Sequence, residues 1–227
     1  MKYWLDLFTP YTWQRFREHG ATISGFRPRQ RKAAYERVTR GDILICYLVK
    51  LSRWCGALEV ESDAFEDTTP IFADTNDPFS IRFKVKPQIL LDFENAIPIE
   101  QPELWNSLSF TKTLPIGVFG WAQSAGLRQS LVEISEADGQ LLNSLLERQQ
   151  QERKTFPLDA SDLRHIQNRT IVRTEQGEVE VEVPAREEEA QEEPLPAAQE
   201  QRTSLTIQAK VARLGIVFWL SRMGTAE

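Results

Sequence analysis

Six cationic side chains gather between residues 24 and 40, where the only acidic residue is Glu36. They are Arg27, Arg29, Arg31, Lys32, Arg37 and Arg40. Arginine presents a planar fork of N–H donors that matches a phosphate group, and clustered cations are typical of nucleic-acid-binding surfaces. The alternative interpretation is a solvated helix face. The predicted phosphate-binding residues are Arg29, Arg31 and Lys32 in this cluster and Arg53 and Lys112 beyond it.

A protein that reads a nucleobase needs aromatic walls for stacking and polar groups for the edge of the base. Trp54 follows the turn of a predicted hairpin, where it is either a pocket wall or packing at the end of a barrel. Tyr47 is expected inside the barrel with its hydroxyl available to a pocket. Ser52, in the hairpin turn, is a candidate hydrogen-bond donor to a base edge or simply a turn residue. We predict Tyr47, Ser52 and Trp54 as base-binding residues.

The chain offers little catalytic chemistry. Its only histidines are His19 and His165, and its only cysteines are Cys46 and Cys55. This set is too small for a His/Cys metal cluster, and two lone residues do not make a credible Cys–His dyad. No glycine-rich phosphate loop follows a predicted strand. We therefore expect a protein that is not an enzyme and that has no catalytic residue, no metal and no cofactor.

These residues need a scaffold, and residues 1–148 predict one compact α+β domain. Apolar runs and alternating patterns predict strands over 3–8, 43–49, 54–60, 79–85 and 130–134. Helices are predicted from Pro10 with Thr9 as the cap, over residues 29–38, and from Ser135 to about residue 151. Many short strands with a few helices predict a small, partly open β-barrel flanked by helices.

The rest of the chain differs in composition. Residues 171–200 carry a net charge of −8 within a whole-chain charge of −6, so the other 197 residues carry +2. A polar, acidic stretch rich in Pro and Ala predicts a disordered linker over 149–202, in which residues 170–183 could form a hairpin. Residues 203–227 predict one helix and one strand, too little for a core, and are interpreted as the truncated start of a second domain.

Cellular location follows from what the sequence lacks. No apolar run approaches the roughly 18 residues that span a bilayer, and no signal peptide is visible after Met1. Two cysteines do not make a disulfide framework. We expect a cytoplasmic protein that does not bind a membrane.

Several segments carry a resemblance to a known family. They are Lys2–Leu5, Phe26–Arg31, Gly41–Asp42, Ile43–Tyr47, Cys55–Val60, Arg82–Val85 and Ser109–Lys112. In order, they match an opening aromatic strand, a loop and helix, a Gly-acid turn, the two strands of a central hairpin, a later strand and a short basic loop. On these residues the chain resembles the EVE domain, a member of the PUA-like/YTH superfamily, and the resemblance implies a PUA-like barrel.

The resemblance also implies site residues. EVE domains look like pockets for modified nucleobases, and their usual loop reads Arg-Asn-Tyr-Gln. Arg27 and Gln30 keep two of those positions here, whereas Pro28 and Arg29 depart from the pattern. Relatives in the superfamily place base-edge contacts where the first strand ends, which here adds Phe8 and Thr9. The resemblance therefore implies four further base-binding residues: Phe8, Thr9, Arg27 and Gln30.

The function implied is a binding module for a modified base in DNA, the reader part of a prokaryotic modification-dependent restriction or defence protein. The tail Arg202–Lys210 is similar to the first helix of a nuclease-like domain that often accompanies EVE domains, so a nuclease is a potential partner. Two alternatives stay open. One is a reader of modified RNA, which the YTH side of the superfamily suggests. The other is a non-catalytic interaction scaffold whose acidic segment recruits a partner protein.

Overall fold

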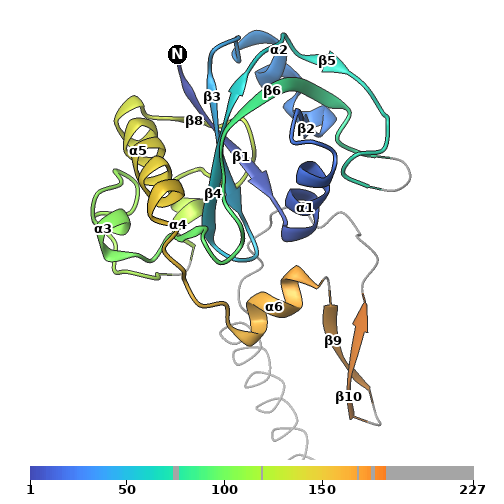
Figure 1. Cartoon of the computed structure of the whole chain (residues 1–227), viewed down its shortest axis with the longest axis vertical. Helices are drawn as coiled ribbons and strands as arrows, with labels where there is room; N and C mark the ends of the chain where they lie inside the picture. Colours follow the sequence, from blue (N-terminus) through green and yellow to red (C-terminus); the bar gives the residue numbers. More distant parts are fainter. Residues whose placement is uncertain (74–76, 119, 168, 175–176, 183–227) are drawn as a thin grey trace, which may run out of the picture. The chain divides into compact units, whose positions relative to one another are not determined.

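Figure 1 shows the computed structural model of the chain. The structure describes residues 1–73, 77–118, 120–167, 169–174 and 177–182, with the backbone alone for the last two ranges. All of these residues belong to one compact unit. Residues 183–202 of the predicted linker and the whole predicted second domain, residues 203–227, lie outside the described residues.

The elements alternate between short strands and short helices along the chain. The strands of the main sheet are β1 (Tyr3–Phe8), β2 (Ile23–Phe26), β3 (Ile43–Leu48), β4 (Arg53–Val60), β5 (Phe65–Glu66), β6 (Ile81–Leu90), β7 (Ile97–Pro98) and β8 (Glu133–Ile134). The helices are α1 (Pro10–Glu18), η1 (Pro28–Gln30, a 3-10 turn), α2 (Arg31–Glu36), α3 (Pro102–Trp105), α4 (Trp121–Ser124), α5 (Glu136–Glu152) and α6 (Ala160–Ile166). A separate hairpin follows, β9 (Arg169–Thr174) with β10 (Gly177–Glu182).

The main sheet is mixed and curled. Its strand order is β2-β6-β4-β3-β1-β8, with β5 paired to β6 and β7 paired to β4. β1 and β3 run parallel, and the other pairs are antiparallel. In Figure 1, α1 and α2 lie on one side of the curl and α3, α4 and α5 on the other. The predicted α+β class, a small, partly open barrel flanked by helices, is confirmed.

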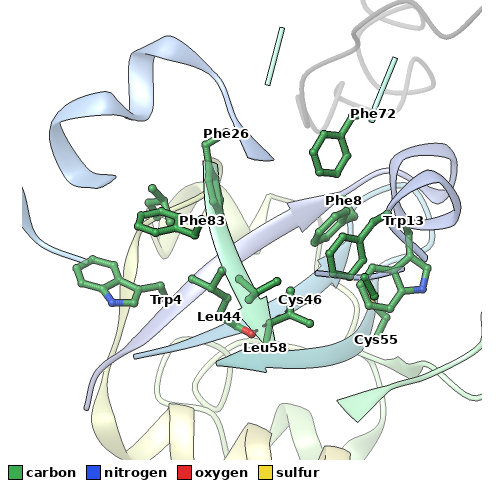
Figure 2. Packing of buried hydrophobic residues seen from close by; sticks show 14 of the residues in the cluster. Trp4, Phe8, Trp13, Phe26, Leu44, Cys46, Cys55, Leu58, Phe72 and Phe83 are labelled. Atoms are coloured by element: carbon green, nitrogen blue, oxygen red, sulfur yellow. Dashed lines mark hydrogen bonds between the residues drawn. The ribbon is translucent and has the colours of Figure 1, made fainter. Parts of the chain in front are cut away.

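Each central strand contributes to two cores because successive side chains point to opposite faces. On β1, Trp4 and Phe8 enter the cluster inside the curl, whereas Tyr3 and Leu5 enter the cluster under α5. Figure 2 shows the inner cluster, with Phe8 beside Trp13 of α1. The burial of both faces explains why β1, β3 and β4 read as apolar runs, whereas β6, with Lys84 and Lys86 exposed, alternates.

Local signals explain several boundaries. Thr9 and Thr12 form a capping box at the start of α1, and Pro10 occupies its first turn. Ser135 caps α5 by accepting from the backbone N–H of Asp138. Gly139 lets α5 approach β1, since an added Cβ would lie 2.1 Å from the Tyr3 ring. These predicted helix starts are confirmed.

Two expectations from the sequence differ from the structure. β6 continues through Pro87 to Leu90, although the sequence predicts a strand that ends at Val85. The register between β4 and β6 shifts at this point, and a bulge is one of the few places in a sheet that accept proline. The predicted helix over 29–38 is shorter, because the chain first makes the 3-10 turn η1 and α2 then spans Arg31–Glu36.

The curl is tied by a buried polar contact. The Ser24 hydroxyl on β2 donates to the Asp6 carboxylate on β1 at 2.6 Å. These two strands are separated by β6, β4 and β3 in the sheet order, so the contact bridges the open side of the barrel. Asp6 is fully buried, and this burial raises its pKa from 3.8 to about 7.

The compact structure extends beyond residue 148, where the sequence analysis placed the end of the domain. That boundary falls inside α5, and Phe156 beyond it is buried in the cluster under α5. The predicted hairpin is present as β9 and β10, with Val179 opposite Val172.

Candidate functional site

A pocket opens at the carboxyl end of β1, beside α1 and η1. Its apolar lining is Leu7, Phe8, Val49 and Phe79. Its polar lining is Thr9, Thr12, Arg27, Arg29, Gln30, Arg128, Gln129 and Ser130. The cavity volume is about 60 Å³, small beside the roughly 300–1,000 Å³ of typical small-molecule pockets. A larger planar ligand therefore needs the side chains at the rim to move.

Phe8 and Thr9 form the part of the pocket next to α1. The Phe8 ring lies edge-on against Trp13, with centroids 5.1 Å apart, and it is 3% exposed. The Thr9 hydroxyl accepts from the Thr12 backbone N–H at 3.1 Å, and the Thr12 hydroxyl accepts from the Thr9 backbone N–H at 2.9 Å. The helix-cap interpretation of Thr9 is therefore confirmed, and the cap also fixes its hydroxyl at the pocket.

Phe79 provides an aromatic wall that the sequence analysis did not identify. The Arg27 guanidinium lies over its ring, 5.2 Å from the centroid. The backbone of Phe79 is fixed on both sides, because its N–H donates to Asp77 and its carbonyl accepts from the Arg82 guanidinium. Arg82 and Asp77 form a fully buried ion pair at 3.2 Å. The wall is thus held by buried charges, while the cation that covers it is half-buried.

Gln30 carries the most informative polar atom of the pocket. Its side chain is 6% exposed, and its Oε1 has no hydrogen-bond partner among the described residues. A buried acceptor without a donor costs about 1–3 kcal/mol. The same loop brings Arg27 and Arg29 to the pocket, so all three side chains line one site. The sequence resemblance implies a base-binding role for two of them, Arg27 and Gln30.

Three residues after α4 complete the rim opposite η1, and sequence reasoning missed them. Arg128 is half-buried, Gln129 is exposed, and the Ser130 hydroxyl accepts from the Leu7 backbone N–H at 3.0 Å. Because that bond uses the oxygen as acceptor, the Ser130 hydrogen can still be donated to a ligand. The only sequence signal was a cation next to two polar residues ahead of a short strand, which is too common to single out.

The structure places Tyr47 and Trp54 away from this pocket. They lie opposite each other on β3 and β4, on the face that α5 covers, with ring centroids 4.7 Å apart. Trp54 is 1% exposed and does not line the pocket described above. The packing alternative therefore holds for Trp54. Its Nε1 is buried without a hydrogen-bond partner among the described residues. Ser52 lies in the β3–β4 turn with a φ of 52° and is also outside this pocket.

Arg53, predicted to bind phosphate, has a different role. It is 4% exposed, and its guanidinium donates to the backbone carbonyls of Phe93, Phe156 and Pro157. It also pairs with Asp162 of α6 at 3.1 Å. These bonds fasten the segment after α5 to the barrel, so a phosphate could reach Arg53 only by displacing that segment.

The other predicted phosphate-binding residues are exposed. Arg29 stands at the rim of the pocket, and Arg31 and Lys32 follow on α2. Arg31 pairs with Glu66 of β5. Lys112 is exposed in a turn after α3 and does not line the pocket. The structure thus brings Phe8, Thr9, Arg27, Arg29 and Gln30 together and leaves Tyr47, Ser52, Arg53, Trp54 and Lys112 elsewhere.

A second cavity, of about 240 Å³, lies between α3, α5 and the segment after α5. Several of its polar side chains already have partners: Arg148 pairs with Glu103, and Gln149 donates to the carbonyls of Asn95 and Lys154. Lys154 lies over the Phe156 ring at 5.1 Å. Although this cavity is larger, it lacks the buried unpartnered acceptor found in the first pocket, which we therefore take as the candidate site.

The described residues contain no group of three or more His, Cys, Asp or Glu side chains arranged to hold a metal ion. None of the helices among them has the length and apolarity required to cross a membrane.

Comparisons with known proteins complete this picture. No protein-family model and no curated protein sequence matches the chain. Among solved structures, the Mmi1 YTH domain in complex with RNA is similar with a TM-score of 0.48 and 13% identity, over 69% of this chain and 84% of that one. The Pho92 YTH domain in complex with m6A gives 0.45 and 16%, over 64% and 86%.

A third similar structure is the YTH domain of Zygosaccharomyces rouxii MRB1 in complex with N6-methyladenosine RNA. It has a TM-score of 0.43 and 15% identity, over 64% of this chain and 86% of that one.

Proposed function

We propose that this chain binds a single-stranded nucleic acid by taking one modified nucleobase into the pocket between β1, η1 and the 128–130 segment. The observation that carries the proposal is the buried, unpartnered Oε1 of Gln30 in that pocket. A base edge that offers an N–H would satisfy this acceptor. Adenine and cytosine keep one such N–H on the exocyclic amine when that amine carries a single methyl group.

The rest of the lining suits the other parts of a nucleotide. Phe79 and Phe8 offer aromatic surface to a base, and Val49 offers apolar contact to a methyl group. Arg27, Arg29 and Arg128 place three cations around the mouth, where the phosphates of a strand would lie. The described lining contains no acidic side chain and no histidine, which supports binding rather than proton-transfer chemistry.

Entry of a base requires a rearrangement that the structure makes specific. Arg27 lies over the Phe79 ring, and the cavity beside it is small. We expect Arg27 to leave the ring or to clamp the base against it. Arginine has a long side chain with several rotatable bonds, so this movement needs no change in the sheet. Phe79 itself stays in place because Asp77 and Arg82 hold its backbone.

RNA is the first ligand to test, as in the solved complexes named above, and this reverses the preference for DNA expected from the sequence. The experiment measures the affinity of the purified chain for five-nucleotide RNA and DNA strands that carry N6-methyladenosine, 5-methylcytosine or the unmodified base at the centre. The proposal expects at least one modified RNA to bind at least about fivefold more tightly than its unmodified counterpart. Tighter binding of modified DNA would restore the DNA interpretation, whereas equal binding of all strands would reject a reader function.

Gln30→Met tests the residue that carries the proposal. The thioether keeps much of the side-chain volume and removes the amide acceptor, so the affinity for the modified strand should fall by about 1–3 kcal/mol. Gln129→Met is the matched control, because Gln129 lines the same pocket but is exposed. Equal effects of both variants would contradict a specific role for Gln30.

A further inference from the structure

Tyr35 is an exposed aromatic residue on the short helix that follows the pocket loop. Its side chain is 48% exposed, and the other large apolar residues with this degree of exposure in the described chain are Met1, Ile116 and Leu163. The neighbouring residue of α2, Ala34, is buried and only 1% exposed. The helix therefore turns Tyr35 outward by its packing.

Arg31 accompanies Tyr35 one helical turn earlier. Its guanidinium carbon lies 5.8 Å from the centre of the Tyr35 ring. Arg31 also pairs with Glu66 of β5, and both members of this pair are about half exposed. The pair restrains the guanidinium beside the ring and leaves part of the ring surface to solvent. An aromatic ring with an adjacent arginine is a combination on which nucleobases stack irrespective of sequence.

The position of α2 connects this surface to the candidate pocket. Arg29 and Gln30 line the pocket, and Arg31 is the next residue along the chain. Tyr35 is five positions beyond Gln30 in the chain, which is about 7.5 Å along a helix at about 1.5 Å per residue. Stacked bases follow one another at about 3.4 Å. Tyr35 is thus within reach of a nucleotide one or two positions away from a base held in the pocket.

We infer that Tyr35, together with Arg31, is a stacking platform for a base that flanks the modified base. This inference rests on the proposed function and deepens it, because it names the ligand class as a strand of two or more nucleotides rather than a free nucleoside. Lys32 is exposed on the same helix, and we expect it to contact the phosphate of the flanking nucleotide. The strand then leaves the pocket across α2.

The test compares a nucleoside with a strand. N6-methyladenosine and a five-nucleotide RNA with this base at its centre are titrated against the unaltered chain, Tyr35→Ala and Tyr35→Phe. Tyr35→Ala should weaken strand binding at least about fivefold, the effect of losing one stacked base, and should leave nucleoside binding unchanged. Tyr35→Phe keeps the ring and should retain strand affinity. Ile116→Ala removes an equally exposed apolar side chain, 49% exposed, and should change neither ligand.

A strand with an abasic site provides the second arm. When the abasic site removes the base that stacks on Tyr35, Tyr35→Ala should cause no further loss of affinity. This result is expected for an abasic site on only one side of the modified base. Unchanged strand affinity in Tyr35→Ala would overturn the platform and leave the pocket proposal standing. An equal loss for nucleoside and strand would also overturn it. If the unaltered chain binds neither ligand, the proposed function itself fails.

Discussion

The charged residues of this protein occupy two contrasting environments. Arg53, Arg82 and Asp6 lie in the interior, where each is at most 4% exposed. Arg29, Arg31 and Lys32 lie on the surface of η1 and α2. In the sequence, the cations of both groups look alike. The difference shows that a count of charges predicts a basic surface only after the partners of each charge are known.

The two groups should contribute to different properties. A buried charge whose partner is removed destabilises the folded state strongly, because the remaining group keeps its desolvation cost without compensation. An exposed ion pair contributes about 1 kcal/mol at most to the free energy of unfolding, because water screens its charges. The interior charges should therefore control stability and the shape of the pocket, and the exposed cations should control the attraction of a nucleic acid.

Arg82→Ala should give the largest effect on stability. Arg82 donates to Asp67 at 2.5 Å, to the Thr69 carbonyl at 2.5 Å and to the fully buried Asp77 at 3.2 Å. Its loss leaves Asp77 without its counter-ion in the interior, so we expect the free energy of unfolding to fall by about 3–5 kcal/mol. Urea denaturation followed by tryptophan fluorescence measures this change.

Arg148→Ala is the matched control for Arg82→Ala. Arg148 also pairs with a carboxylate, that of Glu103, at 2.9 Å, but both side chains are about half or more exposed. We expect a much smaller loss of stability, because water screens this exposed pair. If the two variants lost similar stability, the contrast between interior and surface charges would be broken.

Asp6→Asn should remove a pH dependence of stability. Burial raises the pKa of Asp6 to about 7, whereas the unfolded chain keeps the ordinary value of 3.8. Between these values the folded state holds the proton and the unfolded state releases it, so the free energy of unfolding falls as pH rises from about 4 to 7. The loss reaches roughly 4 kcal/mol for a shift of about three units. An asparagine keeps an acceptor for Ser24 but does not ionise.

Urea denaturation of the unaltered chain and of Asp6→Asn at pH 4, 5, 6 and 7 measures the difference between their free energies of unfolding. Taking this difference cancels the titration of the other acids. The difference should favour Asp6→Asn increasingly toward pH 7. Asp63→Asn serves as the control, since Asp63 is an exposed partner of Arg40. A constant difference across this range would show that Asp6 titrates normally and that its burial carries no electrostatic penalty.

The elements with local signals could be predicted from the sequence. Thr9 and Pro10 mark a helix start through a cap and a fixed φ, and both act within one turn of chain. The hairpin over 43–60 follows from two apolar runs around a short polar turn. The loop that carries Arg27 and Gln30 was also found, although only by resemblance to a family. In each case the informative residues are close together in the sequence.

The misplaced residues depend on distant parts of the chain. Arg53 is buried because the carbonyls of residues 93, 156 and 157 surround it. Trp54 faces α5 rather than a pocket because of its register opposite Tyr47. Conversely, Phe79 and Arg128 reach the pocket from loops more than 40 residues beyond the motif they join. No periodicity or spacing in the sequence encodes these encounters, since they depend on how the sheet curls.

The smallest effect on stability, and the sharpest test of the surface group, is expected for the double variant Arg29→Ala and Arg31→Ala. Both side chains are exposed, so the free energy of unfolding should change by less than about 1 kcal/mol.

The same double variant tests the role of these cations in binding. Phosphate contacts carry no base information, so the affinities for modified and unmodified strands should fall by a similar factor. The dependence of log affinity on log salt should become shallower by roughly one to two units, because each lost contact to a single strand releases about 0.7 fewer counterions. Fluorescence anisotropy at salt concentrations between roughly 50 and 200 mM measures both the affinity and its salt dependence. Arg148→Ala is the control, because Arg148 is a similarly exposed arginine on α5, and it should leave the slope unchanged. An unchanged slope in the double variant would make the η1–α2 cations a solvated helix face, and the strand would then have to approach the pocket across Arg128.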